Sequence, residues 1–307
     1  MYLGNELTEL LQTIESGKVY LSKERLNMEI GVTVLPHFPK DSTDRNRTSP
    51  FAFTGNKFEF RMLGSALSIA EPNIVLNTVI AEALRQFADR LEASGDFDAD
   101  LNRLVIETIQ KHKRIIFNGN NYSEEWVDEA KKLGLSNLKT TVDALPEYIS
   151  KRSLEVFSVH KVFSETELRS RHEILVEGYC KTIHIEALTM LDMVKTEIIP
   201  ACIDYQNDMT ELLARKKASG DYDTSLESHM LSSIAKLSSV LLDKLITLEN
   251  ALLLTKEKND LLPRAVLYRD SVYAAQAELR SVVDELETLV AKKHWPFPTY
   301  AQLLNSV

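Results

Sequence analysis

Hydrophobic residues recur at helical spacing along most of the chain. Near the N-terminus, Leu7, Leu10, Leu11 and Ile14 lie three or four positions apart, and Gly17 follows them as a helix-ending residue. Residues at this spacing share one face of an α-helix, which can then pack against a core. The pattern predicts helices over residues 5–16, 72–95, 98–117, 124–133, 164–217, 225–258 and 263–293.

One N-terminal stretch departs from the helical pattern. Pro36, Pro39 and Pro50 exclude a continuous helix over residues 18–53, because proline removes a backbone donor and crowds the preceding turn. We expect short extended pieces there, for example over residues 31–35.

Residues 57–62 alternate between charged and apolar side chains, which is the period of a β-strand. One face of the predicted strand carries Lys57, Glu59 and Arg61, and the other carries two phenylalanines and a methionine. Such alternation is typical of a half-exposed strand with its charged face in water. The same alternation also fits a strand whose charged face lines a cavity for anions and a cation. The presence of Arg45 and Arg47 just upstream favours this second interpretation.

From residue 146 onward nearly the whole chain is predicted to be helical. Ser164 and Glu167 form the capping box S-E-T-E, and Pro200 is expected to kink the helix that follows. Helices of this length reach roughly 45 to 75 Å at ~1.5 Å per residue, so an antiparallel bundle is expected, with the tail WPFPTYAQLL folded back on it. The predicted fold class is mainly α, with a small α+β N-terminal part and a long-helix antiparallel bundle at the C-terminus.

Composition excludes several classes of protein. Apolar residues make up 44% and charged residues 26% of the chain, which is typical of a globular protein. The net charge of -9 argues against a nucleic-acid partner, and no apolar run is long enough to predict a membrane span. Cys180 and Cys202 are far apart, so a disulfide framework is not expected and the cytoplasm is the predicted location.

Some weaker candidates have simpler explanations. Cys180 and His184, at i and i+4, could present two metal ligands on one helix face, but without a second pair we favour a packed cysteine beside a hydrogen-bonded histidine. His160 and His172 are interpreted as ordinary helix residues. Trp295 is expected to anchor the C-terminal tail.

The motifs R-N-R-T-S-P and K-F-E-F-R resemble the closing part of the glutamine synthetase active site, where most members read N-R-S-A and then R-I-E-x-R. The sequence SPFAFTGNKFEFR most resembles the type III class of the family. The later stretches RIIFNGNNYSEEW, KTTVDALPEYI, EGYCKTIHIEALTM and HWPFPTY also resemble that class, so the likeness covers nearly the whole chain.

The resemblance implies a role for each charged residue. Arg47 matches the arginine that contacts the transferred phosphoryl group, and Arg61 matches the residue that holds glutamate and the phosphorylated intermediate. Lys57 replaces a phosphate-binding arginine, and with Arg45 and Arg47 it is expected to bind ATP. Glu59 matches a carboxylate that coordinates Mg²⁺ or Mn²⁺. These residue types suit phosphoryl transfer, which needs neutralisation of phosphate charge more than covalent help.

Two departures qualify the resemblance. The second arginine usual after N-R-S-A is missing, with Ala52 and Phe53 near that place. The family's other metal-binding glutamates, its metal-binding histidine and its E-A-P flap are not found before residue 44. We therefore interpret residues 1–142 as the C-terminal part of the catalytic domain and residues 143–307 as a helical C-terminal domain, with an active site that this chain alone does not complete.

The resemblance implies an ATP-dependent ligase that joins glutamate and ammonia through γ-glutamyl phosphate, in a homo-oligomer of stacked rings. The alternative is a non-catalytic helical module for assembly or regulation, to which a vestigial active-site strand is attached. The sequence leaves both interpretations open.

Overall fold

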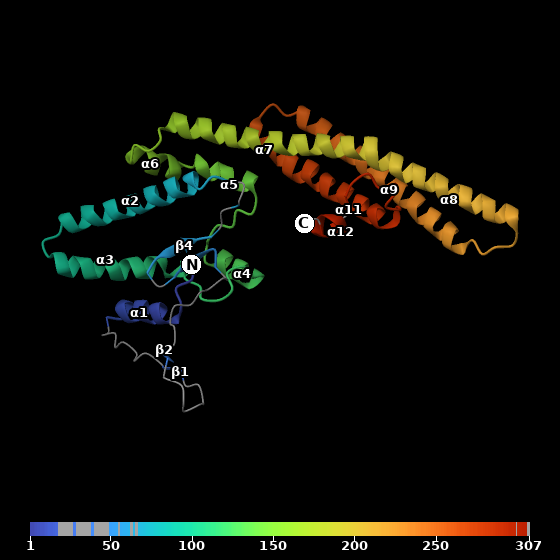
Figure 1. Ribbon diagram of the computed structural model, residues 1–307. Helices are drawn as coiled ribbons and strands as arrows, with labels where there is room; N and C mark the ends of the chain where they lie inside the picture. The colour runs from blue at the N-terminus through green and yellow to red at the C-terminus, as the bar shows by residue number, and fades with distance from the viewer. Residues whose placement is uncertain are drawn as a thin grey trace. The chain divides into compact units, whose positions relative to one another are not determined.

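The computed structural model describes residues 1–17, 27–28, 38–39, 49–54, 56–61, 64, 67–298 and 300–305. The chain divides into two compact units (Figure 1). Unit 1 comprises Met1–Lys139 and Glu155–Phe163, and unit 2 comprises Thr140–Leu154 and Ser164–Val307. Each unit is built mainly from helices, in agreement with the predicted fold class. None of the described helices has the length and apolar content that a bilayer span requires.

Unit 1 combines helices with two short antiparallel strand pairs. Its elements are α1 (Asn5–Glu15), β1 (Asn27–Met28), β2 (Phe38–Pro39), β3 (Phe51–Phe53), β4 (Phe58–Phe60), α2 (Ala70–Glu92), α3 (Phe97–His112), the 3-10 turn η1 (Lys113–Ile115) and α4 (Glu124–Lys132). The strand pairs are β1–β2 and β3–β4. Helix α6 (Lys151–Val159) belongs in part to each unit.

Polar side chains start two of these helices. The Asp96 carboxylate accepts a hydrogen bond from the Ala99 backbone N–H at 3.1 Å, and the Ser123 hydroxyl accepts one from Trp126 N–H at 3.4 Å. Gly134, with φ +70°, follows α4 in the left-handed conformation that glycine adopts readily. These observations confirm the predicted helix over 124–133.

The helix predicted over residues 98–117 is shorter than expected. Helix α3 ends at His112, and the chain continues as η1 and then as extended backbone at Ile116. The cause is a tertiary contact: the Phe117 N–H donates to the Met1 carbonyl at 2.9 Å instead of bonding within a helix. The spacing of apolar residues within one segment gives no information about a hydrogen-bond partner so far away in the sequence.

Unit 2 is an antiparallel helical bundle, as predicted. Its elements are α5 (Thr141–Tyr148), α7 (Glu165–Met193), the π-helical η2 (Val194–Ile198), α8 (Ile199–Ser219), α9 (Ser225–Lys256), α10 (Leu261–Leu267), the π-helical η3 (Tyr268–Tyr273), α11 (Ala274–Leu289) and α12 (Tyr300–Asn305). Short connections reverse the chain between α8 and α9 and between α9 and α10, so that α9 packs against both α8 and α11 (Figure 1).

The first long helix begins and continues as predicted, with one irregularity. Ser164 and Glu167 form the capping box: the Glu167 N–H donates to the Ser164 hydroxyl at 3.3 Å, and the Ser164 N–H donates to the Glu167 carboxylate at 2.8 Å. Pro200 lies in the first turn of α8, directly after η2. Proline has no N–H to donate, and the wider π turn before it accommodates the missing helical bond.

The last long helix differs from its predicted span. It contains the π-helical η3 and ends at Leu289 rather than at Lys293. Beyond it, the N–H groups of His294 and Trp295 both donate to the Ala291 carbonyl, at 2.8 and 3.2 Å, and form a turn. This turn brings the Trp295 side chain into the core of unit 2, which confirms its predicted role as an anchor of the tail.

The core of unit 2 is continuous along the bundle. Buried apolar side chains from α7, α8, α9, α10, η3 and α11 form one cluster. Its largest fully buried members include Ile234, Leu241, Leu248, Leu279 and Leu286. All of these residues belong to unit 2, and removal of their apolar surface from water stabilises the bundle.

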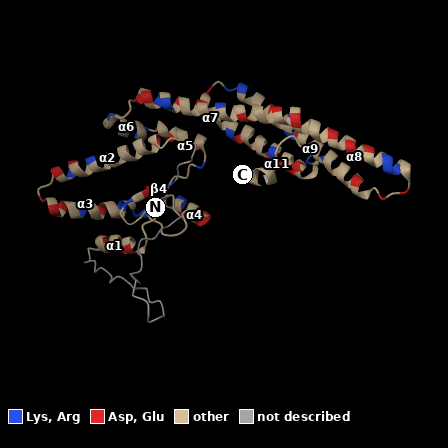
Figure 2. Cartoon of the chain, viewed as in Figure 1, with Lys and Arg blue, Asp and Glu red and all other residues tan. Residues whose placement is uncertain are grey.

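Basic and acidic residues are interspersed along the long helices (Figure 2). Several of them pair across neighbouring helices of the bundle: Lys244 Nζ lies 2.7 Å from a Glu278 carboxylate oxygen, and Lys195 pairs with Glu249. These pairs are partly exposed, so each contributes at most about 1 kcal/mol, and burial of the core decides stability.

In unit 1 the Glu82 carboxylate joins α2 to the end of the α6 segment. It accepts hydrogen bonds from Arg85 Nη2 at 2.8 Å and from Gln86 Nε2 at 2.6 Å, and His160 Nε2 lies 2.8 Å from its other oxygen. Bonding to Arg85, and then to Gln86 and His160, lowers the pKa of Glu82 to about 2. His160, interpreted from sequence as an ordinary helix residue, thus has a defined tertiary partner.

Leu248→Ala should lower the free energy of unfolding by about 2–5 kcal/mol, because it leaves a cavity in a fully buried part of the core. Urea unfolding followed by circular dichroism measures the effect. Leu226→Ala, on the same helix but 69% exposed, is the matched control and should change stability by less than about 0.5 kcal/mol. Equal effects of the two substitutions would contradict the core described above.

Glu82→Gln should reduce stability at neutral pH, and the difference from the wild type should shrink in acid. The folded-state pKa of about 2 lies below the ordinary 4.5, so the stabilisation is complete above pH 4.5 and is lost as the pH falls towards 2. Urea midpoints at pH 6 and pH 3 provide the measurement. Glu71→Gln, which makes the same charge change at the start of α2, is the control. If the stability difference between Glu82→Gln and the wild type does not depend on pH, protonation of Glu82 is not linked to stability.

Candidate functional site

The β3–β4 hairpin carries the predicted site. Its register pairs Phe51 with Phe60, Ala52 with Glu59 and Phe53 with Phe58. Residues directly opposite each other share a face, so Ala52 and Glu59 lie on one face and all four phenylalanines lie on the other. The strand predicted over 57–62 is confirmed in its alternation, with the regular pairing limited to Phe58–Phe60.

Backbone hydrogen bonds fix this hairpin on both sides. Arg61 N–H donates to the Pro50 carbonyl at 2.8 Å, and Thr54 N–H donates to the Lys57 carbonyl at 2.8 Å. On the other edge of β3, Tyr2 forms a parallel bridge to Ala52, with Phe53 N–H donating to the Tyr2 carbonyl at 3.0 Å. The charged side chains therefore project from a backbone that is held at several points.

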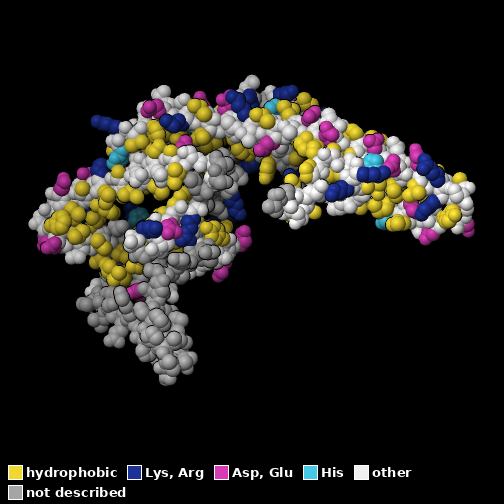
Figure 3. All heavy atoms as spheres, viewed as in Figure 1, with side chains coloured by type: hydrophobic (Ala, Val, Ile, Leu, Met, Phe, Trp, Pro, Cys, Tyr) yellow, Lys and Arg dark blue, Asp and Glu magenta, His cyan; other side chains and the backbone are white. Residues whose placement is uncertain are grey.

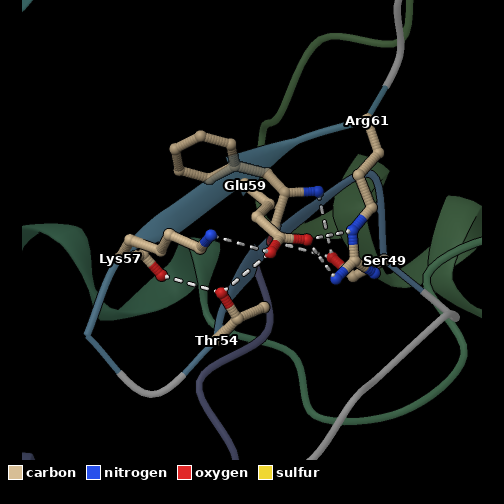
Figure 4. A network of polar contacts seen from close by, with 6 residues as sticks. Ser49, Thr54, Lys57, Glu59 and Arg61 are labelled. Carbon is tan, nitrogen blue, oxygen red and sulfur yellow. Dashed lines mark hydrogen bonds and ion pairs between the residues drawn. The ribbon is translucent and has the colours of Figure 1, made fainter.

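The Glu59 carboxylate is the centre of a polar network on this face (Figure 4). One of its oxygens accepts hydrogen bonds from Arg61 Nε at 3.1 Å and Nη2 at 2.9 Å. The other accepts from the Thr54 hydroxyl at 3.1 Å and lies 3.9 Å from Lys57 Nζ. Hydrogen bonds from Arg61, and then from Thr54, lower the pKa of Glu59, so the group is a carboxylate at neutral pH.

Three of the five predicted site residues thus come together, and their side chains are exposed to different degrees. The Lys57 side chain is 68% exposed, that of Glu59 38% and that of Arg61 27%. Arg45 and Arg47 lie outside the described residues.

The hairpin fits part of a metal-phosphate site. Glu59 offers an ionised oxygen ligand of the kind that Mg²⁺ and Mn²⁺ prefer, and its carboxylate has about four acceptor positions, of which three are used. Lys57 and Arg61 place positive charge beside it, which suits phosphate. Among the described residues, no group of three or more His, Cys, Asp or Glu side chains could hold a metal. Glu59 by itself can offer one such ligand.

The stretch RIIFNGNNYSEEW supports this hairpin indirectly. The Asn118 side-chain oxygen accepts from the N–H groups of Leu3 and Gly4, at 3.2 and 3.1 Å, and thereby fixes the segment that bridges to β3. Phe117 stacks on Trp126 with ring centroids 4.4 Å apart. A Cβ at Gly119 would lie 2.7 Å from the Phe117 ring, so this position requires glycine. The run of asparagines is the signal in the sequence that could have indicated this loop, because asparagine side chains readily bond to nearby backbone groups.

Arg269 is a structural residue that the sequence did not indicate. Its Nη1 donates to the Asp143 carboxylate at 2.6 Å and to the Thr140 hydroxyl at 3.3 Å, and its Nε donates to Asp270 at 2.6 Å. Bonding to Asp270 and Asp143 raises the pKa of Arg269. The pair connects α5, within KTTVDALPEYI, to the π-helical η3 of the bundle. This stretch therefore contributes a contact between α5 and η3 within unit 2.

The cysteine and histidine of α7 are packing residues, as predicted. Burial raises the pKa of the Cys180 thiol, so the thiol stays protonated at neutral pH. His184 Nδ1 lies 3.1 Å from the Tyr268 hydroxyl, which is also 3.3 Å from the Thr255 hydroxyl. These groups connect α7, η3 and α9 inside the bundle.

Comparison with known proteins assigns the chain to a family. Residues 100–217 match the glutamine synthetase C-terminal domain. The chain is 37% identical over 314 residues to the type-3 glutamine synthetase of Dictyostelium discoideum, with 99% of this chain and 42% of that protein covered. It is 37% identical over 311 residues to a glutamine synthetase of Butyrivibrio fibrisolvens, with 100% and 44% covered.

A glutamine synthetase of Bacteroides fragilis (strain YCH46) is 31% identical over 317 residues, with 99% of this chain and 43% of that protein covered. The chain thus spans less than half the length of each of these relatives, while nearly all of it is matched. The order of the motifs and these matches agree: the chain belongs to the glutamine synthetase family, as a C-terminal portion of its type III class.

Proposed function

We propose that the β3–β4 hairpin contributes part of the active site of an ATP-dependent glutamine synthetase, which joins glutamate and ammonia through γ-glutamyl phosphate. The observation that supports this proposal is the convergence of Lys57, Thr54 and Arg61 on the Glu59 carboxylate, on a face open to ligands. A strand that only faced solvent would need no such focus of bonds on one carboxylate.

In this proposal the cations bind anionic groups of the reactants. Arg61 holds the carboxylate of glutamate and then the acyl phosphate, because its planar fork matches both groups with two parallel bonds. Lys57 supplies a mobile point charge to ATP phosphates. Arg45 and Arg47 complete the phosphate contacts, with Arg47 next to the phosphoryl group in transfer. Together these residues neutralise charge that would otherwise oppose the transfer.

Glu59 would hold Mg²⁺ or Mn²⁺, which when bound neutralises the phosphate oxygens of ATP. The Glu59–Arg61 pair is then the resting arrangement of the site. Glu59 orients the Arg61 fork through two hydrogen bonds and would keep it near the face where substrate arrives. Preorganisation of this kind costs little at the moment of reaction, because the cation is already in place.

The remaining metal ligands would come from the part of the enzyme that the relatives carry beyond the matched segment. In the same proposal residues 1–142 are the end of the catalytic domain, and residues 143–307 form a helical domain of a cytoplasmic homo-oligomer of stacked rings.

The alternative function is a non-catalytic assembly or regulatory module. It is favoured by the core cluster of unit 2, all of whose residues belong to that unit. The two functions differ in what they require of the Glu59–Arg61 pair: a vestigial strand does not need it, whereas an active site does.

Arg61→Ala, in an enzyme that joins this chain to the remaining part of the Dictyostelium type-3 enzyme, should lower kcat/KM for glutamate. The loss of a charge-assisted clamp is expected to cost about 2–4 kcal/mol of transition-state stabilisation. A coupled assay for ADP and glutamine measures it.

Arg90→Ala is the matched control for this substitution. Arg90 forms a partly exposed pair with Glu107 in the same unit, at 2.6 Å, and its loss should leave kcat/KM close to the wild-type value. Wild-type turnover in the Arg61→Ala enzyme would favour the non-catalytic module.

The 307-residue chain by itself should fold and yet make no glutamine. Glu59 supplies one carboxylate, and Mg²⁺ needs several converging oxygens before it aligns ATP phosphates for in-line transfer. The same coupled assay, with Arg47→Ala as the control, provides the measurement. Turnover by the chain that disappears in the control would show a complete site within these residues.

A further inference from the structure

Thr54 lies where β3 ends and the turn to β4 begins. Alternation along β3 places Ala52 and Thr54 on the charged face, opposite to the side that Phe51 and Phe53 occupy. The Thr54 N–H donates to the Lys57 carbonyl at 2.8 Å, and this bond closes the turn of the hairpin. Because the backbone of Thr54 already has its partner, the side-chain hydroxyl can serve a separate role.

The Thr54 hydroxyl has one proton and two acceptors within reach. The Glu59 carboxylate oxygen Oε1 lies 3.1 Å away, and the Lys57 carbonyl oxygen lies 3.4 Å away. The shorter contact is to an ionised oxygen, and a hydrogen bond to a charged acceptor is roughly twice as strong as a neutral one. The proton therefore belongs to the bond with Glu59, and Figure 4 shows the Thr54 side chain directed at this carboxylate.

The Glu59 carboxylate is held through both of its oxygens. Arg61 donates to Oε2 from Nε at 3.1 Å and from Nη2 at 2.9 Å, whereas Thr54 donates to Oε1. A carboxylate turns easily about the bond to its own chain, because this torsion has broad energy wells. Bonds on both oxygens fix its plane. Since the Thr54 hydroxyl is neutral, it does so without placing a further positive charge on Oε1.

The residue directly opposite Glu59 on β3 cannot supply this second bond. Ala52 pairs with Glu59 across the hairpin, is fully buried, and ends in a methyl group that donates no hydrogen bond. The polar contact to Oε1 comes instead from Thr54, which lies diagonally across the same face of the hairpin.

These bonds leave one acceptor position on Oε1. The oxygen has two lone pairs, of which Thr54 uses one, and Lys57 Nζ at 3.9 Å is too far away for a hydrogen bond. The Glu59 side chain is partly exposed, and acidic and basic side chains lie together at the surface over β4 (Figure 3). Thr54 therefore sets the direction in which a partly exposed carboxylate oxygen offers its remaining lone pair.

Resting on the proposed function, we propose that Thr54 is a positioning residue for the metal ligand Glu59. Its hydroxyl holds the carboxylate in the plane in which Oε1 offers a lone pair to Mg²⁺ or Mn²⁺, while Arg61 keeps the other oxygen. Ligating carboxylates are commonly held by hydrogen bonds from neighbouring groups, and loss of such a partner typically costs about 10- to 100-fold in metal affinity. In this role Thr54 acts through Glu59 and makes no contact with substrate.

Mn²⁺ binding tests the role in the enzyme that joins this chain to the remaining part of the Dictyostelium type-3 enzyme. The EPR signal of free Mn²⁺ measures the affinity, and Glu59→Gln identifies the site to which Glu59 belongs. Thr54→Val removes the hydroxyl at nearly constant volume and should weaken that site about 10- to 100-fold. Thr54→Ser keeps the hydroxyl and should bind Mn²⁺ like the wild type.

Thr108→Val is the matched control for Thr54→Val. It removes a hydroxyl that donates to the Leu104 carbonyl within α3, at 2.7 Å, and should leave the affinity for Mn²⁺ unchanged. An equal loss of affinity in both variants would show that the effect is not specific to Glu59 and would overturn the proposal.

The kinetics of the joined enzyme separate positioning from damage to the hairpin. In Thr54→Val the Mn²⁺ concentration that gives half-maximal turnover should rise by the same factor as the dissociation constant. The kcat at saturating Mn²⁺ and the KM for glutamate should stay close to the wild-type values. A lower kcat at every Mn²⁺ concentration would contradict the positioning role.

A measurement on the 307-residue chain tests the hydrogen bond without any metal. Loss of the Thr54 bond lets the Glu59 carboxylate turn and loosens its bonds to Arg61. The Arg61 Nε–H, followed by NMR, should then exchange with solvent several-fold faster in Thr54→Val, whereas Thr54→Ser and Thr108→Val should keep the wild-type rate. An unchanged rate in Thr54→Val would show that Thr54 does not fix Glu59.

The positioning role and the proposed function fail in different ways. If Glu59→Gln weakens Mn²⁺ binding and Thr54→Val does not, the positioning role is wrong and the function stands. If both variants weaken Mn²⁺ binding in a protein that makes no glutamine, the function is wrong and the positioning role stands. If neither variant changes Mn²⁺ binding, Glu59 is not a metal ligand and both proposals are wrong.

Discussion

Successive side chains of a β-strand point to opposite faces, and in β4 this geometry sets two surfaces at once. With Phe58 and Phe60 on one face, Lys57, Glu59 and Arg61 must lie on the other. A shift of the register by one residue would exchange the two faces and place the charged side chains where the phenylalanine rings now pack on one another. Hydrophobic packing on one face therefore specifies the position of the charges on the other.

The rest of unit 1 holds that strand in place. The segment of Tyr2 bridges to β3, and Asn118 fixes that segment through two backbone N–H groups. The bundle of unit 2 has a core of its own, built from residues of that unit. Precision in the hairpin thus comes from hydrogen bonds, and stability in the bundle comes from burial.

Helical periodicity predicted the bundle well, because in a long amphipathic helix the spacing of the apolar residues shows which face is buried. The capping box at Ser164 and the turn at Gly134 were equally local signals. The early end of α3 and the role of Arg269 were missed, since each depends on a partner far away in sequence: Met1 for the first and Asp143 for the second. For the site, residue types and alternation predicted the charged face at Glu59, whereas the bonds that focus on its carboxylate needed coordinates.

The π-helical segment η2 affects which side of the long helix faces the core. The buried residues of α7, η2 and α8 form a stripe along this helix. From Leu168 to Cys202 the buried positions step by four residues more often than by three, so their mean spacing exceeds the 3.6 of a straight α-helix. A regular helix would let such a stripe drift around its axis until it left the core. The wider turn at Val194–Ile198 unwinds the helix locally and takes up the accumulated drift. The irregularity before Pro200 thus acts as a phase correction, which keeps one side of a very long helix turned towards the same neighbours.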